Sequence, residues 1–114
     1  MLLYAVIIFA ITAVGGLVLA TNVLGGKLAP WPVSIIHALL GAAGLAILIL
    51  AVMNGEGGMI PISLGLLVVA ALGGFYLASR HMKNQIAPKS IVIIHALVAV
   101  VGFLLLTGTV FQFI

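Results

Sequence analysis

The chain has 114 residues, of which 66% are hydrophobic and 4% are charged. Soluble domains carry about 25% charged residues, so this composition excludes a water-exposed globular surface, and with it a cytoplasmic enzyme or a nucleic-acid-binding protein. The pI of 9.8 comes from a net charge of +3 and does not indicate a polyanionic partner. The absence of cysteine excludes disulfides, thiolate metal sites and iron–sulfur ligands. We therefore expect an integral membrane protein surrounded by lipid.

Four apolar stretches fill almost the whole chain. A membrane-spanning helix needs about 20 apolar residues, and nothing in the chain shows the alternating polarity of a transmembrane β-barrel. Glycine, proline and nearly all the charged residues lie between the stretches, with each proline at or just before the start of a stretch, where its missing N–H costs little. We predict transmembrane helices at 2–24, 31–53, 60–79 and 89–113.

The few charged residues predict the orientation of these helices. Four basic residues fall at one end of the predicted helices, and the only acid, Glu56, falls at the other end. Cytoplasmic loops are enriched in Lys and Arg, so we expect the first and third loops to face the cytoplasm and both termini to lie outside. The protein is then a multi-pass protein of the cytoplasmic (inner) membrane. The basic residues are Lys27, Arg80, Lys83 and Lys89.

The chain contains an internal duplication. A shift of 58 positions aligns residues 1–56 with 59–114 without a gap, and 16 of the 56 pairs are identical. Apolar composition alone does not readily produce the repeated Gly-Gly and Ala-Pro doublets, or the repeated Ile-Ile-His-Ala-Leu segment, at one offset. The stretch up to Ala20 also has the apolar character of a signal peptide, but it lacks a basic start and pairs with an internal helix, so we expect it to be the first transmembrane helix.

The duplication predicts the architecture. Each repeat crosses the membrane twice, so both copies have the same orientation and are related by a pseudo-two-fold axis along the membrane normal, unlike the inverted repeats of many transporters. Short loops make consecutive helices antiparallel neighbours. We predict an all-α, four-transmembrane-helix bundle built from two tandem parallel-repeat helical hairpins. It forms a single membrane domain, 1–114, with repeat 1 at 1–58 and repeat 2 at 59–114.

Two histidines lie inside the predicted helices, at equivalent positions of the repeat. An ionisable residue within a membrane is costly and by default indicates a function. His37 and His95 each follow a proline by seven residues, which places both roughly 10 Å inside the basic end of their helices. The pseudo-two-fold axis allows both to point at the bundle centre. The sequence leaves open that each imidazole only makes a structural hydrogen bond to a neighbouring helix.

Glycines surround these histidines in the sequence pattern. Some lie one and two turns from a histidine on its own helix, and others form doublets at nearly the same depth on the first and third helices. Two facing imidazoles flanked by surfaces without side chains leave space for a flat macrocycle, and haem iron takes axial imidazole ligands. Small residues are also common at helix contacts that hold no ligand. The candidate glycines are Gly15, Gly16, Gly41, Gly44, Gly73, Gly74 and Gly102.

The arrangement resembles the haem-binding four-helix core of membrane b-type cytochromes, in which histidines on the second and fourth helices clamp haem and glycines on the first and third give it room. The segments His37-Ala-Leu-Leu-Gly41 and His95-Ala-Leu-Val-Ala99 are also similar to the His-x-x-x-Gly helices of the cytochrome b561 group. Those families usually have two histidines on each ligand-bearing helix and bind two haems. With one histidine per helix, the resemblance implies one haem b per chain, with His37 and His95 as its iron ligands.

Other polar residues carry weaker signals. Several polar residues gather at the same end as the two helical histidines and either pair with haem propionates or simply follow the positive-inside rule, which is the commoner explanation. They are Asn22, Lys27, Arg80, His81 and Lys89. We expect His81 to be a solvated loop residue, Trp31 to be an interfacial or packing aromatic rather than a stacking group, and Glu56 to be a solvated turn residue.

The missing residues narrow the function further. No Asp or Glu lies in any predicted helix, which excludes a carboxylate relay for protons, a hydrolytic carboxylate–histidine pair and a three-ligand zinc site. The leading hypothesis is a small haem b protein that transfers electrons with a quinol or a larger redox complex, as an oxidoreductase component if it belongs to an enzyme. The alternatives are a cofactor-free accessory or assembly subunit that binds other membrane proteins, and a small channel or carrier, which the lack of charged lining disfavours.

Overall fold

The computed structural model describes all 114 residues, and they form four helices with no strand. Each helix is long and apolar enough to cross a membrane. The long dimension of the molecule is 42 Å, close to the roughly 40–45 Å of a bilayer with its headgroup regions. The predicted all-helical membrane bundle is therefore confirmed. Its helices are α1 (Leu2–Leu24), α2 (Trp31–Met53), α3 (Ile60–Met82) and α4 (Lys89–Val110).

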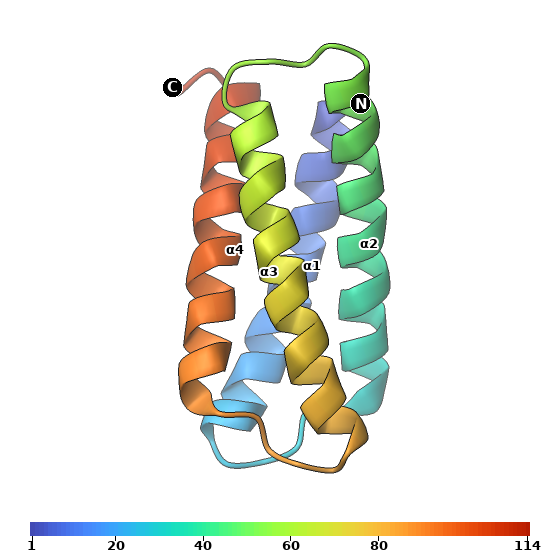
Figure 1. Ribbon diagram of the computed structural model, residues 1–114, viewed down its shortest axis with the longest axis vertical. Helices are drawn as coiled ribbons and strands as arrows, with labels where there is room; N and C mark the ends of the chain where they lie inside the picture. The colour runs from blue at the N-terminus through green and yellow to red at the C-terminus, as the bar shows by residue number, and fades with distance from the viewer.

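The helices form two hairpins that pack side by side (Figure 1). α1 packs along α2 and α3 along α4, while the hairpins touch each other through α1 with α4 and α2 with α3. α2 and α4 are therefore diagonal partners, as the repeat predicts. Both termini and the α2–α3 loop lie at one end of the bundle, which we call the terminal end. The α1–α2 and α3–α4 loops lie at the other end, which we call the basic end because it carries Lys27 and Lys83.

The two helices that end at the basic end, α1 and α3, are each followed by a residue with a left-handed backbone conformation. Gly26 has φ +81° after α1, and its repeat equivalent Asn84 has φ +55° after α3. Glycine and asparagine are the residues that tolerate this conformation at a helix C-terminus. The prediction that the third helix ends at residue 79 is wrong, because Arg80 and His81 form its last turn, where positive groups suit the helix dipole. The fourth helix ends at Val110 rather than 113, since Gln112 has φ +61°.

Large apolar side chains fill the terminal half of the bundle. The aromatic ring of Phe9 lies against Gly44, where a Cβ would come within 2.7 Å of the ring, and Leu67 lies against Gly102 in the same way, at 2.9 Å. In addition, the buried Ser63 hydroxyl donates a hydrogen bond to the carbonyl oxygen of Gly102 at 2.7 Å. The core of the protein therefore lies in this half. Its fully packed members are Ala5, Val6, Phe9, Leu48, Ile60, Leu67 and Leu106.

The outer surface of the helices is apolar. Large hydrophobic side chains such as Leu39, Leu72 and Leu97 are each at least 60% exposed. Water does not favour such a surface, whereas lipid chains do, so the exposed leucines are the expected lipid-facing side chains of a bundle in a bilayer. The fold is that of a multi-pass membrane protein.

Candidate functional site

The structure brings the two predicted histidines together inside the bundle. His37 and His95 extend from the diagonal helices α2 and α4, and their ring centroids are 6.3 Å apart with an interplanar angle of 74°. Both side chains are half-buried. No helix contains Asp, Glu or Cys, and the third histidine, His81, lies in the last turn of α3, so these two are the only histidines in the middle of the helices.

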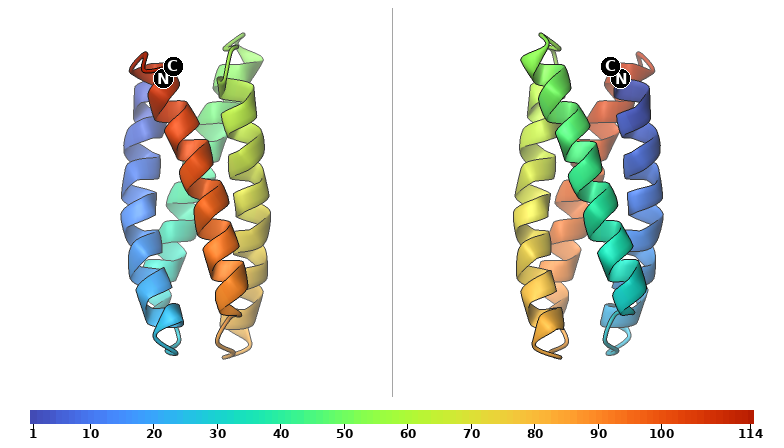
Figure 2. Two further views of the ribbon diagram at one scale, coloured as in Figure 1. Left: turned by 90° about the vertical axis from the view of Figure 1, so that its left-hand side faces the viewer. Right: turned by 90° about the vertical axis from the view of Figure 1, so that its right-hand side faces the viewer.

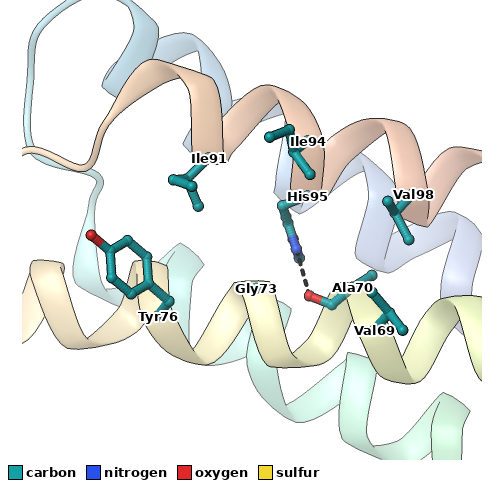
Figure 3. A pocket seen from close by; sticks show the side chains of 8 residues that line it. All are labelled: Val69, Ala70, Gly73, Tyr76, Ile91, Ile94, His95 and Val98. Carbon is teal, nitrogen blue, oxygen red and sulfur yellow. Dashed lines mark hydrogen bonds between the residues drawn. The ribbon is translucent and has the colours of Figure 1, made fainter.

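Each imidazole is fixed by a hydrogen bond to the other helix of its own hairpin. His37 Nδ1 lies 2.8 Å from the Thr12 carbonyl oxygen on α1, and His95 Nδ1 lies 2.7 Å from the Ala70 carbonyl oxygen on α3 (Figure 3). A carbonyl oxygen only accepts, so Nδ1 is the protonated nitrogen in both rings. Neither Nε2 has a hydrogen-bond partner in the protein. In a neutral ring, each Nε2 therefore keeps a free lone pair.

The glycine doublets of α1 and α3 let these imidazoles approach closely. A Cβ on Gly16 would lie 3.0 Å from Cε1 of His37, and a Cβ on Gly74 would lie 3.3 Å from Cε1 of His95. Gly15 and Gly73 likewise face the Cβ and Nδ1 atoms of the same rings. The doublets thus serve first to seat the histidine rings against the neighbouring helix.

The remaining predicted glycines have different neighbours. Gly41 lies one turn from His37, near the Thr12 methyl group, and lines the central cavity. Gly44 and Gly102 instead accommodate Phe9 and Leu67 of the terminal half. These last two glycines therefore contribute to the packed core rather than to the surface around the histidines.

A central cavity of about 440 Å³ opens between the four helices on the basic side of the core. This volume falls within the roughly 300–1,000 Å³ that small-molecule and cofactor sites occupy. Both histidines line it, and most of its other lining residues are apolar and come in repeat-equivalent pairs, so the cavity straddles the pseudo-two-fold axis. Small residues widen it on all four helices: Ala13, Gly16, Ala20, Ala38, Gly41, Ala71, Gly74, Ala78, Ala96 and Ala99.

The cavity extends from the core to the loops of the basic end. Phe9, Leu67 and Phe103 lie along its inner limit, and Ala29, Ile86 and other loop residues line its mouth. The two hairpin loops at this end stand apart in both views of Figure 2. The histidines therefore lie at the boundary between a packed half and an open half of the bundle.

A second, smaller pocket lies between α3 and α4 (Figure 3). Its volume is about 310 Å³, and apolar side chains such as Val69, Ile94 and Val98 line it together with His95. His95 and its hydrogen-bond partner Ala70 line both this pocket and the central cavity. The pocket offers no second polar group beside that ring apart from Tyr76, so the central cavity is the better candidate for a ligand.

Two residues at the cavity mouth differ from their predicted roles. His81 lies in the last turn of α3 and is only 7% exposed, so the expectation of a solvated loop residue is wrong. Its ring stacks on Trp31 of α2, with centroids 3.8 Å apart and an interplanar angle of 10°, so Trp31 is a stacking group after all. A signal for this lay in the repeat, because His81 aligns with Val23, an apolar position of a predicted helix. Glu56 is exposed in its turn, as predicted.

No group of three or more His, Cys, Asp or Glu side chains is placed to hold a metal ion. The two histidines by themselves offer two ring nitrogens without a partner in the protein. No protein-family model, curated protein or solved structure matches the chain. The function must be argued from this site alone.

Proposed function

We propose that the protein is a small membrane protein that binds one haem b, with His37 and His95 as the two axial ligands. The observation that carries the proposal is the matched hydrogen bonding of the two rings. Metal-ligating histidines almost always donate their other ring N–H to a carboxylate, a backbone carbonyl or water, which fixes the tautomer and the ring orientation. Both rings donate from Nδ1 to a helix carbonyl and leave Nε2 free.

The spacing of the rings supports the same conclusion. A metal bonded at about 2 Å by each of two imidazole nitrogens separates the ring centroids by roughly 6 Å, and the observed separation is 6.3 Å. The interplanar angle of 74° does not conflict with shared ligation, because rotation of a ring about its bond to a metal leaves that bond unchanged. A pair of histidines that only packed against neighbouring helices would need no such spacing.

The cavity around the rings also fits a flat apolar group. Small residues of all four helices surround the histidines, and the lining carries few polar atoms apart from the imidazoles, Ser34, His81 and Gln85. Such a lining excludes water and holds a macrocycle through van der Waals contact. The chain therefore offers ligands, space and an apolar wall in one place.

Haem with two protein ligands supplies one-electron chemistry and leaves no open position for oxygen. We therefore infer that the protein transfers electrons, with a quinol or a larger redox complex as its partner. The basic end faces the cytoplasm in this proposal, because cytoplasmic loops are enriched in Lys and Arg. A single haem nearer to one face cannot carry electrons across a core of about 30 Å, so transfer across the membrane would require partner proteins.

Purification from haem-replete cells tests the proposal directly. We expect red protein with a Soret band and sharp α and β bands after reduction. His37→Ala and His95→Ala should each abolish the six-coordinate spectrum, because each removes one ligand. Leu39→Ala, a change of an exposed side chain on α2, is the matched control and should keep the full spectrum. Colourless wild-type protein would overturn the proposal and favour a cofactor-free accessory subunit.

A further inference from the structure

At the mouth of the central cavity, the two repeats carry different residues at equivalent positions. The two proposed ligand histidines, and the glycine doublets against which their rings pack, are related by the repeat. At the mouth, His81 stands where the other repeat has Val23, and Trp31 stands where the other repeat has Lys89. The stacked pair Trp31–His81 therefore exists only between α2 and α3. A ligand in the cavity therefore meets His81 on one side and Val23 at the equivalent position on the other.

His81 is a buried polar side chain without a partner in the protein. It is only 7% exposed and lines the cavity, and its ring forms no hydrogen bond to another residue. No fully buried side-chain nitrogen in the protein lacks a partner, so the ring nitrogens of His81 are accessible from the cavity or from outside. A neutral imidazole always carries one N–H donor, and an accessible donor can bond either to a ligand or to water. Stacking on Trp31 fixes the ring without satisfying that donor. The donor is therefore available to a group that a ligand in the cavity supplies.

The charges around the mouth indicate which kind of group this is. All charged residues of the basic end are positive, and the only acid of the chain, Glu56, lies in the loop at the terminal end. Gln85 also lines the mouth, and its Oε1 accepts a hydrogen bond from Arg80 Nη1 at 2.6 Å, which leaves its amide N–H groups as donors. The mouth thus presents hydrogen-bond donors and no anion, and the charged residues of the loops at this end are all positive. An anionic oxygen is the complementary group.

We propose that His81 donates a hydrogen bond to an anionic oxygen at the cavity mouth, either a carboxylate of the bound haem or the phosphate of a lipid headgroup. The first source rests on the proposed function and is the one that the cavity favours, because the ring lies on the wall of the same space that contains the two ligand histidines. In that case, His81 is the positioning residue that gives a nearly symmetric site one preferred haem orientation, with the carboxylates toward the basic end.

Titration of the apoprotein with haem and with haem dimethyl ester, followed at the Soret band, tests this role. The ester has the same macrocycle but no carboxylate. We expect wild-type protein to bind haem about tenfold more tightly than the ester, as for a hydrogen bond to a charged group. His81→Phe keeps an aromatic ring against Trp31 but has no N–H donor, so the ratio of the two dissociation constants should fall toward one.

Two controls separate the possible outcomes. Lys83→Gln removes an exposed positive charge from the same loop and should leave most of the tenfold ratio in place. The titrations are repeated in nanodiscs with and without phosphatidylglycerol. If His81→Phe leaves the ratio unchanged but abolishes a stabilisation by the anionic lipid, the anionic oxygen belongs to a lipid phosphate. If His81→Phe changes neither, this proposal is overturned although haem still binds. If wild-type protein shows no Soret band and no lipid effect, both proposals fail together.

Discussion

The two halves of the bundle use the same four helices in opposite ways. In the terminal half, Phe9 and Leu67 fill the space beside Gly44 and Gly102, and Leu48 and Leu106 are fully buried. In the basic half, small residues leave a cavity of about 440 Å³, and the one buried polar ring there is His81, which is 7% exposed. One half therefore holds the hairpins together, and the other leaves room between them.

This difference shows how a duplicated hairpin can combine stability with binding. Between helices in lipid, association depends on close packing and on interhelical hydrogen bonds, since lipid chains are as apolar as leucine. The packed half supplies these contacts without the basic half. The histidines lie at the boundary, where the core holds their helices in place and the cavity gives access to Nε2. Substitutions should therefore affect stability in one half and ligand binding in the other.

The largest effect on stability is expected for Leu48→Ala in the packed half. Leu48 is 0% exposed, and truncation of a buried leucine leaves a cavity that costs about 2–5 kcal/mol. The low end of this range applies because the lipid reference state is itself apolar. Unfolding by dodecyl sulfate in mixed micelles measures the loss. Leu39→Ala on the same helix, at a position 66% exposed, is the control, and equal losses from both variants would contradict a core confined to the terminal half.

A matched pair of insertions on α2 tests both halves at once. Ala51 is 1% exposed in the packed half, so Ala51→Leu should overpack the core and cost about 1–3 kcal/mol. Ala38 lines the central cavity, so Ala38→Leu should leave the stability of the apoprotein nearly unchanged but weaken haem binding in a Soret titration. The opposite pattern, with a destabilised Ala38→Leu and an unaffected Ala51→Leu, would show that the halves are assigned the wrong way round.

Much of this arrangement is predictable from the sequence because two strong signals agree. Hydropathy locates the four helices, and the 58-residue repeat places His37 and His95 at equivalent depths on parallel helices. The pseudo-two-fold axis allows both rings to point at the bundle centre, while their separation of 6.3 Å is known only from the structure. The hydrogen bonds of their Nδ1 atoms are not predictable, because the acceptors are backbone carbonyls, which every helix residue carries.

The cavity mouth and two of the glycines are less predictable for a physical reason. The stacking of Trp31 on His81 joins residues 50 positions apart. The alignment of His81 with Val23 indicates a helical position, but the equivalents Val23 and Lys89 form no ring pair that would predict the stacking. Polar residues near a loop also suggest a loop, although a helix C-terminus favours positive groups. Gly44 belongs to the same glycine stripe as Gly41, yet what fills its space is Phe9 of another helix, which the pattern of one helix cannot show.

The smallest expected effect concerns the one buried side-chain hydrogen bond within the core. Ser63 Oγ donates to the Gly102 carbonyl oxygen at 2.7 Å and joins α3 to α4, whereas its repeat equivalent Ala5 has no such bond. Interhelical hydrogen bonds in a membrane are worth about 0.6 kcal/mol on average, so Ser63→Ala should lower the free energy of unfolding by about that amount. Thr109→Val is the control, because the Thr109 hydroxyl bonds to Leu105 of its own helix. A loss with Thr109→Val as large as with Ser63→Ala would mean that this bond does not help to join the helices of the packed half, and that side-chain packing alone does so.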